Sequence, residues 1–377
     1  MPSHLETPTV RIHVELGARS YPVLIGSGLL ARFGEIVREH VLRQTNAFVI
    51  TNELVGAHYF EPLRASLEHS GCTRIVRHDL PGSEEGKNWD EFTSACAGLL
   101  AAFPEAGASP LVVLLGGGVV GDLGGFAAAV FRRGVPFVQV PTTLLAAVDS
   151  SVGGKVAVNF GGVKNIMGAF SQPRLVVCDL DVLQTLPPRE VRSGTAEIIK
   201  YGAVCSAALF EQLEAGALEK VLALDSDALV DIVAQCVRLK AEVVAQDELD
   251  ERGIRNVLNF GHTIGHALEL SADYALTHGE AISIGMIAAA RLGERLGTTD
   301  AAAVTRLDKL LTRAGLPTSF PDAPGLFDRV KSTMQMDKKF RGGKNLFVLL
   351  TVPGAWQQRE NVPWDIVDRA LRGVLSS

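Results

Sequence analysis

The chain has 377 residues, 47% hydrophobic and 21% charged, which is enough for two domains with sizeable cores. A formal net charge of −6 and a pI near 5.9 argue against a general nucleic-acid binder, which needs a basic face. The sequence has no apolar run of about 18 residues, no basic and apolar leader, and five cysteines without CxxC spacing. We therefore expect no membrane span, no signal peptide and a reducing compartment, the cytoplasm.

The first half alternates short apolar segments with helix-like segments. Residues 10–16 alternate apolar and polar side chains, and residues 21–25 form a second apolar run; together they predict a β-hairpin. Strands are then predicted over 47–51, 74–78, 111–115, 136–140 and 174–179, and helices over 29–40, 59–69, 90–103 and 122–131. Strands and helices alternating at this length predict an open, mainly parallel sheet with helices on both faces.

The second half is rich in alanine and leucine and reads as helical. Helices are predicted over 190–204, 206–219, 226–246, 281–296 and 300–314. Because the character changes at the Leu-Pro-Pro-Arg turn, we expect two domains, residues 1–181 and 182–377.

A histidine cluster stands out in the second half. His262 and His266 are four residues apart, so on a helix they project from one face. His278 follows in a Thr-His-Gly-Glu turn that can bring it back to the same point. Neutral imidazoles at this spacing suit a divalent metal. Ordinary polar or core histidines are the alternative, and at this stage the two interpretations weigh about equally.

A glycine-rich turn follows the predicted strand 111–115. Six glycines lie between Gly116 and Gly125, where a strand runs into a helix. Backbone without Cβ atoms can close on a pyrophosphate, and a helix N-terminus offers free N–H groups to it. The order of residues is not G-x-G-x-x-G, so a tight packing turn remains the alternative. Three cations near this turn, Arg133, Lys155 and Lys164, suit a phosphate together, although for any one lysine a solvated loop charge is the favoured interpretation.

These motifs taken together resemble the 3-dehydroquinate synthase family. The resemblance is carried by Gly-Gly-Gly-Val-Val-Gly-Asp-Leu, Pro-Thr-Thr-Leu-Leu-Ala, Asp-Ser-Ser-Val-Gly-Gly-Lys-Val, Gly-Thr-Ala-Glu-Ile-Ile-Lys, Leu-Asn-Phe-Gly-His-Thr-Ile-Gly-His and His-Gly-Glu-Ala. It spans nearly the whole chain, and it implies a Rossmann-like α/β NAD-binding domain followed by an all-α domain that binds metal and substrate, with the active site between them.

The resemblance also implies the ligands of each group. One divalent metal, Zn²⁺ or Co²⁺, would be held by Glu197, His262 and His278. The implied NAD contacts are Glu84, Lys87, Gly118, Val119, Val120, Gly121, Asp122, Thr142, Thr143, Lys155, Lys164, Leu183 and Thr185. The implied substrate contacts are Arg133, Asp149, Lys155, Asn165, Lys200, Lys240, Arg255, Asn259, His266, Lys338 and Lys339. The implied catalytic set is His266, Glu251, Lys155 and Lys240.

The family's reaction converts 3-deoxy-D-arabino-heptulosonate 7-phosphate into 3-dehydroquinate and phosphate, in the shikimate pathway to chorismate and the aromatic amino acids. It proceeds by transient oxidation with NAD, phosphate elimination, reduction and aldol closure, and the phosphate itself is a second candidate for the general base. A sister cyclase acting on another sugar phosphate is the alternative function. The resemblance further implies a homodimer in which Arg133 reaches the partner's site. One segment departs from the family pattern, because Gly82-Ser83 stand where an aspartate is usual before Glu84, which affects the ribose contacts.

Overall fold

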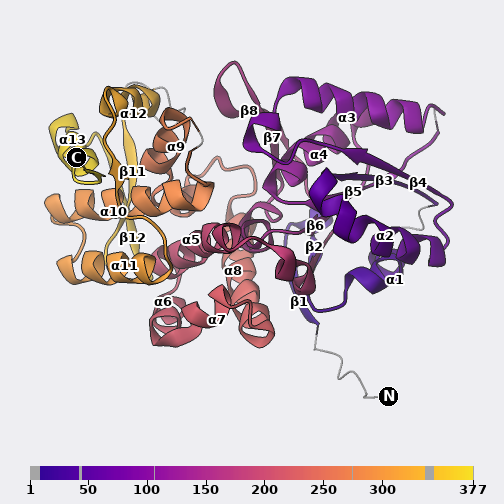
Figure 1. Ribbon diagram of the computed structural model, residues 1–377, viewed down its shortest axis with the longest axis horizontal. Helices are drawn as coiled ribbons and strands as arrows, with labels where there is room; N and C mark the ends of the chain where they lie inside the picture. The colour runs from indigo at the N-terminus through magenta and orange to yellow at the C-terminus, as the bar shows by residue number, and fades with distance from the viewer. Residues whose placement is uncertain (1–8, 42–44, 106, 274, 336–343, 377) are drawn as a thin grey trace. The chain divides into compact units, whose positions relative to one another are not determined.

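The computed structural model describes residues 9–41, 45–105, 107–273, 275–335 and 344–376 (Figure 1). The chain divides into two compact units, Met1–Leu186 with Leu229–Leu249, and Pro187–Ala228 with Asp250–Ser377.

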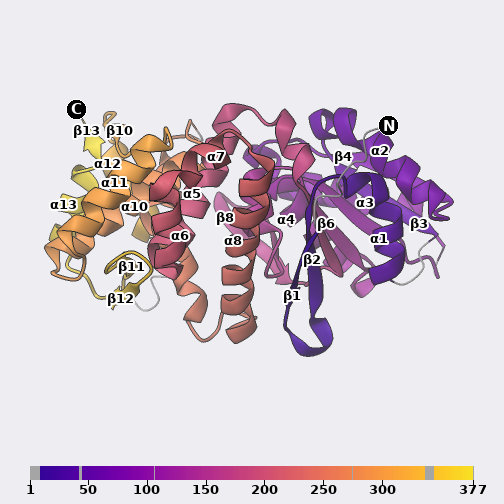
Figure 2. The same ribbon diagram turned by 90° about the horizontal axis from the view of Figure 1, so that it is seen from below.

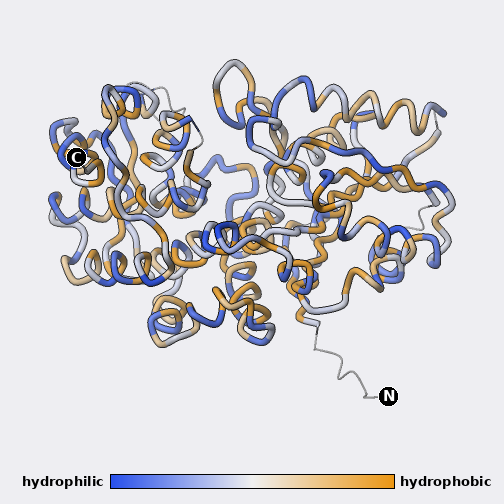
Figure 3. The backbone as a smooth tube through the Cα atoms, in the orientation of Figure 1, coloured by the Kyte–Doolittle hydropathy of each residue, from blue (hydrophilic) through white to orange (hydrophobic). Residues whose placement is uncertain are grey.

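The first unit is built on a seven-stranded sheet in the order β1-β2-β9-β6-β5-β3-β4. Its strands are β1 (Val10–Val14), β2 (Tyr21–Gly26), β3 (Asn46–Thr51), β4 (Arg74–Asp79), β5 (Leu111–Gly116), β6 (Phe137–Pro141) and β9 (Leu175–Asp179). Only the β1–β2 pair is antiparallel, as the predicted hairpin requires. Every residue of β5 and β6 is buried, and Figure 3 shows this part of the sheet as mainly hydrophobic. Such continuous apolar strands are typical of a parallel sheet covered on both faces.

Helices cover both faces of this sheet, which confirms the predicted fold class. Figure 1 shows α1 (Phe33–His40) and α2 (Glu53–His69) on one side, and α3 (Trp89–Ala102) and α4 (Gly118–Val130) on the other. Helix α4 begins four residues before the predicted start at Asp122. Its glycines have low helix propensity, which hid the first turn, but they let the helix lie close to the sheet. A Cβ atom at Gly121 would lie 2.9 Å from the Gln139 side chain of β6.

A second hairpin, which the sequence did not predict, joins β7 (Lys155–Phe160) to β8 (Val163–Phe170). Gly161 and Gly162 form its two-residue loop with φ of 59° and 77°. Two successive positive φ values are those of a type I′ turn, which glycine adopts without strain. The hairpin carries several apolar side chains that are more than one-third exposed, namely Phe160, Val163, Ile166, Met167 and Phe170.

The second unit is mainly helical, as predicted. Its helices are α5 (Pro188–Cys205), α6 (Ala207–Gln212), α7 (Leu218–Leu222), α9 (His262–Ser271), α10 (His278–Arg295), α11 (Ala301–Arg313), α12 (Leu326–Gln335) and α13 (Trp364–Arg372). Strands β10 (Phe320–Pro321) and β13 (Leu375–Ser376) form one small sheet, and β11 (Leu346–Leu350) and β12 (Trp356–Glu360) form another. The single helix predicted over 206–219 is wrong, because Gly216, at φ 116°, interrupts it.

Helix α8 (Ser226–Gln246) belongs to the first unit from Leu229 onward. Figure 2 shows its end on the same side as the turn of the β1–β2 hairpin. There the Arg19 guanidinium donates two hydrogen bonds to the Glu248 carboxylate, at 2.8 and 2.6 Å. The domain boundary expected between residues 181 and 182 stays a prediction, and the compact units differ from it in that residues 182–186 and 229–249 belong to the first unit.

Among the described residues, no helix is both long and apolar enough to cross a membrane. All five cysteines lie in the described ranges, and none of them forms a disulfide there. Burial raises the pKa of Cys178 to about 12, so this thiol stays protonated at neutral pH.

Candidate functional site

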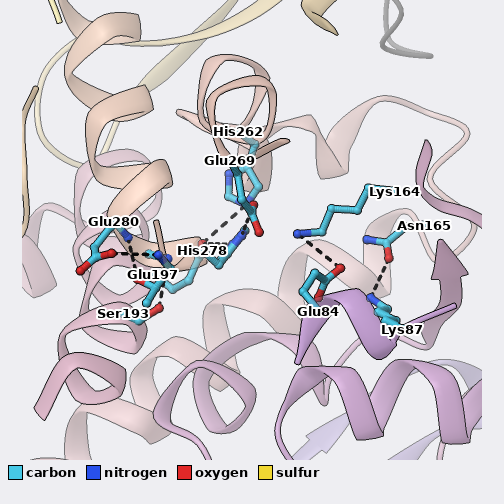
Figure 4. A network of polar contacts seen from close by, with 12 residues as sticks. Glu84, Lys87, Lys164, Asn165, Ser193, Glu197, His262, Glu269, His278 and Glu280 are labelled. Carbon is cyan, nitrogen blue, oxygen red and sulfur yellow. Dashed lines mark hydrogen bonds and ion pairs between the residues drawn. The ribbon is translucent and has the colours of Figure 1, made fainter. Parts of the chain in front are cut away.

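Three helices of the second unit bring Glu197, His262 and His278 together (Figure 4). Glu197 lies within α5, and the two histidines are the first residues of α9 and α10. Nε2 of His262 and Nε2 of His278 lie 3.5 and 3.4 Å from the same atom, Oε1 of Glu197. Two imidazoles and a carboxylate suit a divalent ion such as zinc and leave coordination positions open. Glu197, His262 and His278 therefore fit a divalent metal, and they stay predicted ligands.

His266 lies one turn after His262. With His262 and His278 it forms a second possible set of metal ligands, which overlaps the first. Its ring centroid is 5.0 Å from that of His262 and 5.5 Å from that of His278. One nitrogen from each of the three histidines falls within 4.8 Å of the others. Glu197 is fully buried, whereas His266 is partly exposed. Of these two residues, His266 is therefore the one that a dissolved molecule can reach, in keeping with its predicted role toward substrate.

Glu197 forms a buried ion pair with Lys200, three residues later on α5. Their side chains are 0% and 1% exposed. A buried charge is tolerated only when it is paired, so each side chain offsets the cost of burying the other. Lys200, predicted as a substrate ligand, therefore also neutralises the carboxylate in the absence of a metal.

Glycines hold α9 and α10 in backbone contact and so set the spacing of the histidines. A Cβ atom at Gly285 of α10 would overlap the Gly261 carbonyl oxygen and lie 2.7 Å from the Gly265 nitrogen. Gly261 precedes His262 and has a φ of 79°, which side chains rarely adopt. The close crossing fixes the start of α9, and hence His262, against α10.

A capping box fixes the start of α10, where His278 lies. The Thr277 hydroxyl accepts from the Glu280 N–H, and the Glu280 carboxylate accepts from the Thr277 N–H at 2.8 Å. Arg189 of α5 donates two bonds to the same carboxylate, at 2.9 and 2.6 Å. The helix that carries Glu197 is thus joined to the first turn of the helix that carries His278.

We expect Glu280→Gln to destabilise the protein in a pH-dependent way. Burial alone would raise the pKa of Glu280, but Arg189 and Thr277 reverse this and hold it below its ordinary value. A depressed carboxylate pKa stabilises the folded state above the ordinary pKa, and this contribution is lost as pH falls through the folded value. Since Arg189 is half exposed, the loss is about 1 kcal/mol at pH 7, and it diminishes at an acidic pH at which Glu280 becomes protonated. Urea unfolding at both pH values measures this loss of unfolding free energy. The control is Glu294→Gln, at the exposed far end of α10. A loss that does not depend on pH would contradict the role given to the Glu280 carboxylate.

The predicted dinucleotide residues of the first unit gather where β5 and β6 end. Helix α4 starts directly after β5, with Gly117 as its N-cap and no side-chain cap. Thr142 and Thr143 follow β6, the neighbouring strand. Thr142 is 3% exposed, and its hydroxyl has no hydrogen-bond partner among the described residues. A helix N-terminus without a side-chain cap and a buried hydroxyl without a described partner thus lie at the carboxyl edge of a parallel sheet. This arrangement suits the binding of a dinucleotide.

Four more predicted NAD residues form a polar cluster with one predicted substrate residue (Figure 4). Lys87 is 3% exposed, pairs with the Asp122 carboxylate and donates to the Asn165 side chain at 2.6 Å. Lys164 lies 3.6 Å from the Glu84 carboxylate. Burial raises the pKa of Asp122, against the opposing effect of Lys87. Lys87 thus connects Asp122, a predicted NAD contact, to Asn165, a predicted ligand of the substrate phosphate.

The remaining predicted residues are less closely grouped. Lys240 pairs with Asp149 at 2.9 Å, so these two substrate candidates meet in the first unit. Arg255 and Asn259 share the short helix Ile254–Asn259, with Arg255 buried, whereas Glu251 is exposed. Leu183 is fully buried and the Thr185 hydroxyl bonds that of Tyr59 at 2.7 Å. Lys338 and Lys339 lie outside the described residues.

Sequence reasoning missed two contacts of the histidine cluster. Glu269 bonds His278, and Ser193 accepts from the Gly279 N–H at 3.0 Å. The signal for Glu269 was a carboxylate in an apolar helix, three residues after His266. Ser193 gave no signal, because only the crossing of α5 and α10 brings it to Gly279.

Comparisons with known proteins agree with this architecture. The family models described as 3-dehydroquinate synthase N-terminal and C-terminal match residues 77–193 and 194–340. A 3-dehydroquinate synthase of Caulobacter vibrioides (strain NA1000 / CB15N) is 48% identical over 343 residues, 90% of this chain and 91% of that protein. One from Neisseria meningitidis serogroup B (strain ATCC BAA-335 / MC58) is 43% identical over 368 residues, 97% of this chain and 99% of that protein.

Solved structures of related cyclases share the fold. A 2-epi-5-epi-valiolone synthase from Streptomyces hygroscopicus subsp. jinggangensis 5008, with NAD⁺ and Zn²⁺ bound, matches with a TM-score of 0.83 at 26% identity, covering 96% of this chain and 97% of that one. A 2-deoxy-scyllo-inosose synthase complexed with carbaglucose-6-phosphate, NAD⁺ and Co²⁺ matches with a TM-score of 0.84 at 24% identity, covering 97% and 100%.

Proposed function

This chain belongs to the 3-dehydroquinate synthase family, and on that premise we propose that it converts 3-deoxy-D-arabino-heptulosonate 7-phosphate into 3-dehydroquinate and phosphate. The observation that carries the proposal is the convergence of Glu197, His262 and His278 in a chain 48% identical to a named synthase. The reaction makes it a phosphorus–oxygen lyase that depends on NAD and on a divalent metal.

The chain's own residues bind and orient the substrate in this proposal. Bound metal and NAD supply Lewis acidity and reversible hydride transfer. Glu197, His262 and His278 hold the metal, and the glycine turn with Thr142 and Thr143 holds NAD. Phosphate is bound by Lys155, Asn165 and His266, while Arg255, Asn259, Lys240 and Asp149 bind the carboxylate and hydroxyls. His266 borders the metal ligands and is partly exposed, so it can accept or return a proton there, with Glu251 assisting.

A sister cyclase is the second candidate, because the solved neighbours are such enzymes. Their identities of 26% and 24% are well below the 48% and 43% of the named synthases, which favours the heptulosonate phosphate. The test supplies each candidate sugar phosphate with trace NAD and Zn²⁺ and follows phosphate release. Release from sedoheptulose 7-phosphate but not from the heptulosonate phosphate would overturn the proposal. NADH accumulating with turnover would instead indicate a dehydrogenase.

We also propose that the chain is a homodimer in which Arg133 completes the partner's phosphate site. Arg132 and Arg133 both have positive φ, 52° and 66°, so the backbone turns sharply there. The Arg132 guanidinium donates to the carbonyls of Phe103 and Ala108, each at 2.8 Å, whereas Arg133 is exposed. Arg132 thus stabilises the turn and Arg133 is presented to solvent. The apolar side chains exposed on the β7–β8 hairpin offer the same unit a face for a second copy.

Mixed dimers test this prediction. Arg133→Ala and Lys155→Ala should each be nearly inactive alone. Co-expressed and isolated as mixed dimers, they should regain about half of wild-type activity, because one of the two sites in each mixed dimer would be intact. The measurement is the activity of mixed dimers purified through two different tags, one on each variant. The control is the same mixture with Arg132→Ala in place of Arg133→Ala. No regain in verified mixed dimers would place Arg133 in its own subunit's site or outside any site.

A further inference from the structure

We infer that Glu269 is a positioning residue of the proposed metal site: it accepts the Nδ1–H of His278 and so leaves the Nε2 of that ring for the metal. The inference rests on the metal binding in the proposed function and adds a residue that the motifs did not assign.

The two nitrogens of His278 face two different carboxylates. Nδ1 lies 3.3 Å from Oε2 of Glu269, and Nε2 lies 3.4 Å from Oε1 of Glu197 (Figure 4). A neutral imidazole has one N–H and one acceptor nitrogen. If Nδ1 carries the hydrogen and donates it to Glu269, Nε2 keeps a lone pair on the side of Glu197.

His262 is arranged in the same way. Its Nδ1 lies 3.2 Å from the Phe260 carbonyl oxygen, and its Nε2 lies 3.5 Å from Oε1 of Glu197. A carbonyl oxygen only accepts, so Nδ1 of His262 carries the hydrogen. Both rings therefore direct Nε2 to one point. Metal-binding histidines usually donate their other N–H to a carboxylate or a carbonyl, which fixes the tautomer and the ring orientation.

The position of Glu269 supports this role. Its side chain is only 4% exposed, between apolar neighbours on α9, where a carboxylate is costly to bury without partners. Glu269 lies on the same helix as His262 and His266, so α9 both supplies histidines and orients the histidine of α10.

Three variants separate positioning from ligation and from packing. Glu269→Ala removes the acceptor, Glu269→Gln keeps an acceptor oxygen without charge, and Leu268→Ala disturbs the adjacent core. Zn²⁺ affinity is measured by competition with a chromogenic chelator in the absence of substrate, together with the visible spectrum of the Co²⁺-loaded protein. We expect Glu269→Ala to weaken Zn²⁺ binding about 10–100-fold and to change the Co²⁺ spectrum. Glu269→Gln should stay within a few-fold of wild type, and Leu268→Ala should lower Tm with little change in metal affinity.

Other outcomes overturn the inference. Unchanged affinity in Glu269→Ala would remove the role, and equal losses in Glu269→Ala and Leu268→Ala would reduce it to packing. A Glu269→Gln variant as deficient as His278→Ala would make Glu269 a ligand. A wild-type protein that binds no Zn²⁺ would overturn the proposed function as well, whereas the three results above leave that function standing.

Discussion

Glu197→Gln is expected to abolish tight metal binding and to lower activity at least 10³-fold, while also destabilising the second unit. The substitution keeps the size of the side chain but removes the charge that faces both histidines and Lys200. Removing one partner of a buried ion pair costs about 3–5 kcal/mol, because the other charge stays buried. Metal content of the purified protein, steady-state phosphate release and urea unfolding measure the three effects.

The double variant Glu197→Gln with Lys200→Met separates ligation from stability. Replacing both members of a buried pair by neutral groups is often nearly neutral, so the double variant should regain most of the lost unfolding free energy. It should still bind no metal. A double variant that recovers both stability and metal would show that Glu197 acts on the fold alone.

His266→Ala decides between the two overlapping ligand sets. With Glu197, His262 and His278 as ligands, the variant should keep its metal and lose activity. Loss of the metal in His266→Ala, with metal retained in Glu197→Gln, would establish the three-histidine set instead.

The second large effect is expected from Gly285→Ala, which adds one methyl group where α10 meets the backbone of α9. The nearest atoms belong to the backbone at Gly261 and Gly265, so no side-chain rotation relieves the overlap. Overpacking of this kind costs about 1–3 kcal/mol. Because the helices must separate, His262 moves away from His278, and we expect metal affinity to fall at least tenfold together with Tm.

Gly107→Ala is the matched control, since nothing lies within 4 Å of the added methyl group and the residue is exposed. It should leave stability and metal binding within error of wild type. A Gly285→Ala protein with wild-type metal affinity would show that the crossing of α9 and α10 does not set the histidine spacing.

Much of the fold could be predicted because its signals are local. Strands such as β5 are continuous apolar runs, and helices such as α8 are long and periodic. The β7–β8 hairpin was missed because its strands are largely exposed and irregular, although Gly161-Gly162 marks the turn. Helix α4 was shortened because glycine opposes helix formation in isolation, and packing against Gln139 overrides that preference.

The sequence supplied candidate residues for the site, which stay predictions, but it did not supply the contacts among them. His262 and His266 share a helix face, which spacing alone shows. The link from Lys87 to Asn165, and that from Glu269 to His278, join different elements, and a single sequence does not reveal long-range pairs. Arg132 and Arg133 carry the same charge, so the sequence did not assign them different roles. Only the carbonyls that accept from Arg132 show that it stabilises the turn.

The order in which Glu197, Lys200 and the histidines leave the ribosome has a consequence for biosynthesis. Helix α5 emerges first and already carries both members of its ion pair three residues apart, so the carboxylate has a local counter-charge before His262 and His278 are synthesised. His262 and His278 follow only after α8 has been made. The proposed ligand set is therefore incomplete until most of the chain has been translated, so we expect the metal to bind late in maturation and not to nucleate folding.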